Sequence, residues 1–165
     1  MVGLSPSTRT NLIDQGFGIL DEEAKGRYAA PLRFTPGVGT TLIVAGLALR
    51  SPVWLGSMSL VALTGVLLPR GMVLDLVYNF GVRRIVHAPP LPPTPKPRRF
   101  SYLLSSVLLA GSALLFHYGF TAIGLILGGL VATGGAILTA SLWCLGSWFY
   151  RLIFRQAADD SALIH

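Results

Sequence analysis

Two kinds of side chain in this sequence could do chemistry: a single thiol and an isolated imidazole. Cys144 is the one cysteine of the chain, which excludes an intramolecular disulfide and any metal cluster held by cysteines. We expect a buried cysteine that packs as a small apolar residue. A reactive thiol is the alternative, so Cys144 is kept as a weak redox candidate.

His117 is the second candidate, because it lies in a short polar turn between two apolar runs. A neutral imidazole near a membrane interface can ligate a haem iron or a chlorophyll magnesium, although contact with solvent explains the residue adequately. The adjacent acids Asp21, Glu22 and Glu23 do not share one face of a helix, and we interpret them as solvated. No metal-ligand spacing, catalytic triad or nucleotide motif stands out, so we predict no catalytic residue, no metal and no enzyme.

The composition places these groups in a membrane protein. The 165 residues are 52% hydrophobic and 12% charged, whereas soluble chains are about 25% charged. The net charge of +6 comes from basic residues at the ends of apolar runs, which indicates membrane topology and not nucleic-acid binding. The N-terminal segment lacks the pattern of a secretory signal, so we expect no cleavage.

Four uncharged apolar runs predict four transmembrane helices. They cover residues 35–49, 53–68, 100–116 and 120–150. The last run exceeds the roughly 20 residues that cross a hydrocarbon core of about 30 Å. Short polar turns connect the runs into two hairpins whose layouts coincide after a shift of 66 positions, as in a parallel repeat.

The connection between the hairpins has its own character. Residues 71–87 place apolar side chains on one face and Asp75, Asn79 and Arg83 on the other, which predicts a helix in the membrane plane. Residues 88–97 contain six prolines and should form an extended strap. The predicted fold is therefore an all-α integral membrane protein of four transmembrane helices, in two parallel-repeat hairpins joined by an amphipathic surface helix and a proline-rich strap.

We divide the chain into five segments on this basis. They are an N-terminal cytoplasmic or interfacial segment (1–30), a first transmembrane hairpin (31–69), an amphipathic helix with a Pro-rich linker (70–99), a second transmembrane hairpin (100–154) and a cytoplasmic tail (155–165). Of the 13 Lys and Arg residues, only Arg50 lies in an outer turn, so the positive-inside rule places both termini in the cytoplasm. The expected contacts to lipid headgroups are Arg83, Arg84, Lys96, Arg98 and Arg99.

Small residues recur every four positions in the last apolar run. They are Gly124, Gly128, Ala132, Ala136 and Ala140, and Cys144 continues the series. This spacing puts them on one helix face, where another backbone can approach closely. We interpret the face as a packing seam within the protein's own bundle, with docking of a different subunit as the alternative.

The closing segment Cys144-Leu145-Gly146-Ser147, followed by aromatic residues, carries a resemblance to a known family. With the two hairpins and their basic, proline-bearing connection, it resembles a bacterial integral membrane family catalogued as domain of unknown function 4395. The resemblance covers about residues 34–154 and implies the bacterial inner membrane. Relatives often have a second cysteine where this chain has Ser147, which implies a thiol pair that this chain lacks.

We expect a non-catalytic accessory subunit that packs against and stabilises a larger respiratory or photosynthetic membrane complex. Its expected partners are the lipid bilayer and other integral membrane subunits, and not nucleic acid. No cofactor is predicted, while a bound lipid or pigment is left open. The alternatives are a thiol- or sulfur-handling membrane protein with a thioredoxin-like partner, and a passive carrier. The absence of Asp, Glu, Lys and Arg from the four runs disfavours an ion-driven transporter.

Overall fold

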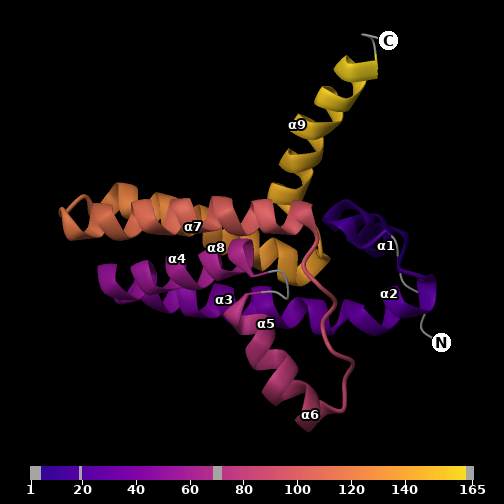
Figure 1. Cartoon of the computed structure of the whole chain (residues 1–165). Helices are drawn as coiled ribbons and strands as arrows, with labels where there is room; N and C mark the ends of the chain where they lie inside the picture. Colours follow the sequence, from indigo (N-terminus) through magenta and orange to yellow (C-terminus); the bar gives the residue numbers. More distant parts are fainter. Residues whose placement is uncertain (1–4, 19, 69–71, 163–165) are drawn as a thin grey trace.

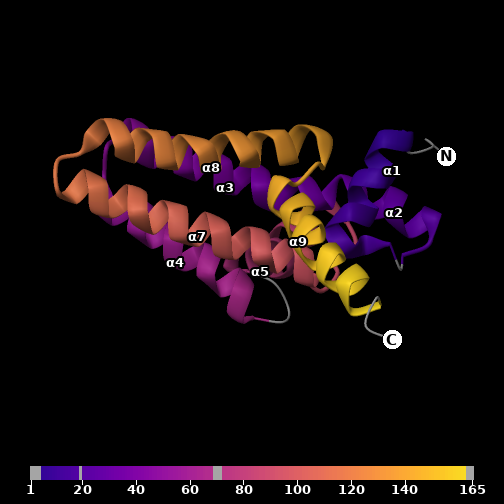
Figure 2. The same ribbon diagram turned by 90° about the horizontal axis from the view of Figure 1, so that it is seen from above.

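The computed structural model describes residues 5–18, 20–68 and 72–162, with side chains as far as Phe154. The described residues form helices and no strand, which confirms the all-α class. Four long helices run alternately up and down: α3 (Pro31–Ala48), α4 (Pro52–Leu67), α7 (Lys96–His117) and α8 (Thr121–Ser141). They lie side by side, and their two short turns are at the same end of the bundle (Figures 1 and 2).

The two hairpins are held together by close contacts between helices that are distant in sequence. Helix α4 packs mainly on α7, and α3 packs mainly on α8. Where α4 crosses α7, the hydroxyl of Ser59 donates to the carbonyl of Ser106 at 2.8 Å, and Ser106 donates to the carbonyl of Ser59 at 3.0 Å. Small hydroxyl side chains allow this approach and satisfy each other, so the pair fixes the register of the two hairpins.

The expectation of four membrane spans is supported for two helices. Helices α7 and α8 are both long and apolar enough to cross a membrane. Helix α4 is apolar but has only 16 residues, and α3, with 18 residues, contains Pro36 in its interior. Length and composition therefore identify two candidate spans in the described part of the chain.

The uncharged run at 120–150 is not one helix, which corrects the sequence prediction. Helix α8 ends at Ser141, Leu142 takes the left-handed conformation with a φ of 56°, and α9 (Leu145–Ala162) leaves the bundle at a steep angle (Figure 1). A left-handed residue after the last turn is a common helix stop. The series of small residues therefore does not continue to Cys144.

Side chains from the N-terminal segment cap the end of α8. The amide of Asn11 donates to the carbonyl of Ser141 at 2.8 Å, and the amide of Gln15 donates to the carbonyl of Leu142 at 2.5 Å. The last carbonyls of a helix have no hydrogen-bond donor within the helix. The two side-chain amides supply these donors at the end of α8.

The N-terminal segment is folded onto the end of the bundle opposite the two short turns (Figure 1). It forms α1 (Pro6–Leu12), the π-helical turn η1 (Ile13–Phe17) and α2 (Glu22–Ala29). Leu12 and Phe17 join a buried cluster with residues from four other places in the chain, Leu32, Tyr78, Leu91 and Leu142. Burial raises the pKa of Tyr78 in this cluster.

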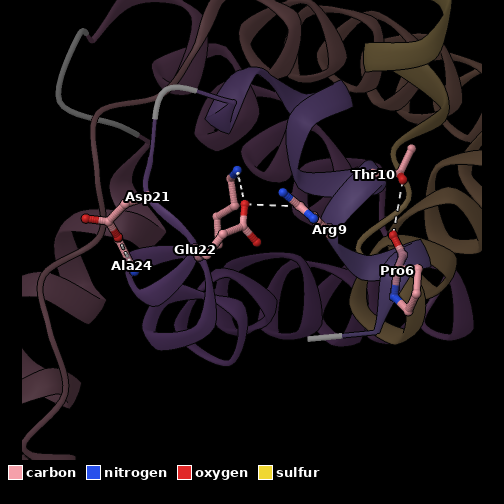
Figure 3. Close-up of polar contacts among 7 residues, drawn as sticks. Pro6, Arg9, Thr10, Asp21, Glu22 and Ala24 are labelled. Atoms are coloured by element: carbon pink, nitrogen blue, oxygen red, sulfur yellow. Dashed lines mark hydrogen bonds and ion pairs between the residues drawn. The ribbon is translucent and has the colours of Figure 1, made fainter. Parts of the chain in front are cut away.

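The acidic residues at the start of α2 have structural roles. The carboxylate of Asp21 caps the helix by accepting from the backbone N–H of Ala24 at 2.6 Å. Glu22 accepts from Lys25 at 2.9 Å and pairs with Arg9 of α1 at 3.1 Å (Figure 3). The hydrogen bond from Lys25 holds the pKa of Glu22 below its usual value, and Arg9 acts in the same direction.

We expect Glu22→Gln to loosen α1 from α2. Because the pKa of Glu22 is lowered in the folded chain, its contribution is present above the ordinary carboxyl pKa and is lost as the pH falls through the lowered value. Hydrogen–deuterium exchange of residues 6–17 should accelerate in the variant at neutral pH. Glu23→Gln is the control, since Glu23 makes no ion pair within the described residues. Equal exchange in both variants would contradict the assignment.

The connection between the hairpins has the predicted elements. It consists of α5 (Val73–Val77), the π-helical turn η2 (Tyr78–Val82) and α6 (Arg83–Val86), followed by an extended strap over 88–95. The strap is shorter than predicted, because Lys96 and Pro97 form the first turn of α7.

The amphipathic segment has its polar face turned toward the protein. Asp75 is 5% exposed, and the side chain of Asn79 accepts from the N–H of Leu91 in the strap at 2.7 Å. Phe80 and Ile85 on the other side are 68% and 79% exposed. Asp75 and Asn79 therefore face the protein, and Phe80 and Ile85 face outward, whereas Met72 at the start of the segment is buried.

Candidate functional site

A partly open cavity of about 270 Å³ lies between the helices of the bundle. All four bundle helices and the start of α9 contribute to its wall, which is largely apolar. Its polar side chains are Thr35, Thr40, Arg98, Ser101, Tyr102, Ser105 and Cys144. A largely apolar cavity with a few convergent polar groups is the usual form of a small-molecule site.

Arg98 is the most unusual group in this wall. It lies in the first turn of α7 and is only 4% exposed. Its Nε donates to the hydroxyl of Tyr102 at 3.1 Å, and its guanidinium lies 5.9 Å from the ring centre of Phe17 and 5.8 Å from that of Tyr102. Within the described residues, no carboxylate lies within 4.0 Å of it. Buried charges in proteins are normally paired.

Asp75 is the buried acid of the same region, but its oxygens are occupied. Oδ1 accepts from the hydroxyl of Thr35 at 2.5 Å, and Oδ2 accepts from the backbone N–H of Met72 at 3.1 Å. The carboxylate therefore anchors α5 to α3. It is not a direct partner of Arg98.

Cys144 and its neighbours lie against the start of α7. The thiol is 3.0 Å from the hydroxyl of Ser101, and the hydroxyl of Ser147 is 3.4 Å from the same oxygen. Cys144 is 8% exposed, and Ser147 is fully buried. At Gly146 an added Cβ would lie 2.8 Å from the Cα of Ser101. The thiol therefore reaches the cavity wall as a buried side chain.

The predicted small-residue face divides between two surroundings. Gly124, Gly128 and Ala132 are buried, and Gly128 faces Leu47 and Ser112 of neighbouring helices. Ala136 and Ala140 are exposed. The first three residues therefore form a seam within the bundle, and the last two do not.

The other predicted residues lie outside the cavity, with one exception. His117 is exposed at the end of α7, beside Tyr118, and no group of three metal-ligating side chains occurs among the residues that were placed. Of the basic residues expected at lipid headgroups, Arg84 and Lys96 are exposed, and Arg83 and Arg99 are half-buried. The prediction is wrong for Arg98, because the cavity and the N-terminal segment enclose it.

The burial of Asp75 and Arg98 was not predicted from the sequence, and neither was the role of the half-buried Tyr102 beside Arg98. Asp75 carried a signal, since it is the one charge in the apolar stretch 72–77. No such signal marks Arg98 in the sequence. The next residue is also an arginine, Arg99, but it is half-buried whereas Arg98 is buried.

The fold and cavity define a helical-bundle protein of membrane-type composition with a partly open, largely apolar cavity between its helices. The chain belongs to the family described as Domain of unknown function (DUF4395), whose model matches residues 29–155. This confirms the family indicated by the closing segment. No curated protein and no solved structure matches the chain.

Proposed function

We propose that the chain is an integral protein of the bacterial inner membrane, with its four-helix bundle across the bilayer and both termini in the cytoplasm. Helix α7, with 22 residues, is about 33 Å long, enough for a hydrocarbon core of about 30 Å. Helices α4 and α3 pack along α7 and α8, so they cross with them, and modest shortness is tolerated by local thinning of the bilayer.

Exposed apolar side chains on every bundle helix support this placement. Val44, Leu60, Val107 and Ile126 are between 51% and 64% exposed, one on each of the four helices. Large exposed apolar surfaces on a protein mark sites of contact with a membrane or a partner. If the bundle stood in water, these apolar side chains would be exposed to solvent.

Helix α9 and the α5–α6 segment fit the membrane surface. They leave the bundle on opposite sides, α9 upward and α6 downward in Figure 1. Phe80 and Ile85 on one, and Leu152 and Phe154 on the other, are between 47% and 79% exposed. Apolar side chains on helices transverse to a membrane bundle are placed to enter the headgroup region.

We infer that the protein acts as a non-catalytic accessory subunit, packed against other subunits of a larger respiratory or photosynthetic membrane complex. The outer face of α8 carries this inference. A Cβ at Gly129 would meet no atom within 4 Å, and Thr133, Ala136 and Ala140 are exposed on the same side of the helix. Gly128 and its neighbours already supply the seam within the bundle, so this second small-residue face is left for another transmembrane helix.

Photo-crosslinking in native membranes tests the subunit role. A photoreactive amino acid at Ala136 should give an adduct with one discrete membrane protein. Val107, which is 61% exposed on α7, is the control position and should give lipid adducts alone. Lipid adducts alone at Ala136, or an adduct of twice the chain's own mass, would count against an accessory subunit.

The alternative role in thiol chemistry finds less support. Cys144 is 8% exposed and hydrogen-bonded to Ser101, and a serine occupies the second position of the expected pair. A thioredoxin-like partner would have to reach into the cavity to meet the thiol.

A further inference from the structure

We propose that the cavity binds a single-chain amphiphile with an anionic head, which pairs with Arg98 while the alkyl chain occupies the apolar part of the cavity. This goes beyond the accessory role and does not depend on it. The observation behind it is a cation that is 4% exposed and lines a cavity, with a single hydrogen bond from its side chain to the described residues.

The free donors of Arg98 define the head group. A guanidinium carries N–H donors in a planar fork, and it binds carboxylate or phosphate oxygens through two parallel hydrogen bonds. Tyr102 takes the Nε donor, which leaves the donors at the tip of the fork. These terminal nitrogens are not among the fully inaccessible polar atoms of the described residues that lack a partner, and Arg98 is part of the cavity wall.

The polar groups around Arg98 suit the binding of one anionic head group. The hydroxyls of Tyr102 and Ser105 line the wall and can donate to an oxyanion, whereas the hydroxyl of Ser101 donates to the carbonyl of Pro97 at 3.2 Å. Asp75 is the opposing charge of the region, and its two oxygens already accept from Thr35 and Met72. The carboxylate of Asp75 therefore lowers the net positive charge near Arg98 but does not bind the free donors of the guanidinium.

The rest of the wall defines the tail. Ile43, Ala62, Leu109, Val131 and Leu138 belong to it, and they come from all four bundle helices. The volume of about 270 Å³ is near the lower end of small-molecule sites, roughly 300–1,000 Å³. A single alkyl chain fits this space better than a two-chain lipid or a ring system of pigment size.

Binding of three dodecyl compounds to the full-length chain tests the proposal. The protein is placed in phosphatidylcholine nanodiscs, and binding is measured against empty nanodiscs at a pH where a carboxylic acid is ionised. Dodecanoate and dodecyl phosphate share one tail with the neutral control dodecanol. At least one anion should bind about tenfold more tightly than dodecanol, and the tighter anion identifies the head group. Equal binding of all three compounds would overturn the proposal.

Variants separate the head from the tail. Arg98→Gln should reduce the affinity for the anions to that of dodecanol, while Arg99→Gln, a neighbour outside the cavity wall, should leave it unchanged. Val131→Phe should weaken all three compounds by filling the tail region, and it keeps the proposal testable if Arg98→Gln fails to fold. Unchanged anion binding in a folded Arg98→Gln variant, or in Val131→Phe, would contradict the site.

Discussion

Replacing Asp75 by alanine should release the α5–α6 segment from the bundle and lower the free energy of unfolding by about 3 kcal/mol. The carboxylate is 5% exposed and accepts from the hydroxyl of Thr35 and from the N–H of Met72. Hydrogen bonds to a charged group are worth about 1.5–3 kcal/mol each, and a donor left unsatisfied in a buried site adds its own cost. Few other single changes in the described chain remove two such bonds together.

Hydrogen–deuterium exchange over residues 72–86 and thermal unfolding in the same detergent measure this effect. Exchange should rise across the segment and the melting temperature should fall. Asp75→Asn is the matched control, because it keeps the shape and one acceptor oxygen, and it should fall between the wild type and the alanine variant. An alanine variant with wild-type exchange and melting would show that α5 is held by its apolar contacts alone.

Asp75 also marks the limit of what helical periodicity predicts. The spacing of Asp75 and Asn79 correctly separated a polar face from an apolar face. It could not say which face meets the solvent, because the rule that polar faces point outward holds in water. Where the surroundings of a bundle are apolar, polar side chains are expected to turn inward to find partners. The exposed Phe80 and the buried Asp75 follow this second rule.

Turns and the strap could be predicted because their causes are local. Pro52 opens α4 in its first turn, after a cap from Ser51 to the N–H of Trp54, and Gly119 takes a φ of 84° between α7 and α8. These residue types restrict or permit backbone angles whatever surrounds them. The two hairpins and the extended strap therefore follow from the sequence.

The end of α8 and the burial of Arg98 have causes that are distant in the chain. The run 120–150 shows no stop signal at Leu142, since leucine rarely adopts the left-handed conformation. The amides of Asn11 and Gln15, more than 120 positions away, bind the carbonyls at that break. Phe17, from the same segment, covers Arg98. Arg98 differs from Arg99 through its contacts with Phe17 and Tyr102 and its place in the cavity wall, so no pattern within residues 96–99 could have separated them.

Gly146 lies where α9 packs closely against α7 at Ser101. Gly146→Ala should destabilise the fold by about 1–3 kcal/mol, the usual cost of overpacking. The added Cβ would lie 2.8 Å from both the Cα and the Cβ of Ser101. Because one of these atoms is backbone, rotation of a side chain cannot relieve the contact, and the two helices must separate.

Separation of the helices should be visible at the thiol as well as in stability. The contact of 3.0 Å between Cys144 and Ser101 lies beside Gly146, so the variant should react faster with a maleimide than the wild type does. Gly129→Ala is the control, since its added Cβ meets no atom within 4 Å. It should leave labelling unchanged and slightly raise stability, because alanine favours a helix over glycine by about 0.5–1 kcal/mol. Two variants with the same melting temperature and labelling rate would show that α9 is free to shift on α7, and the cavity wall at Cys144 would then not be fixed by this crossing.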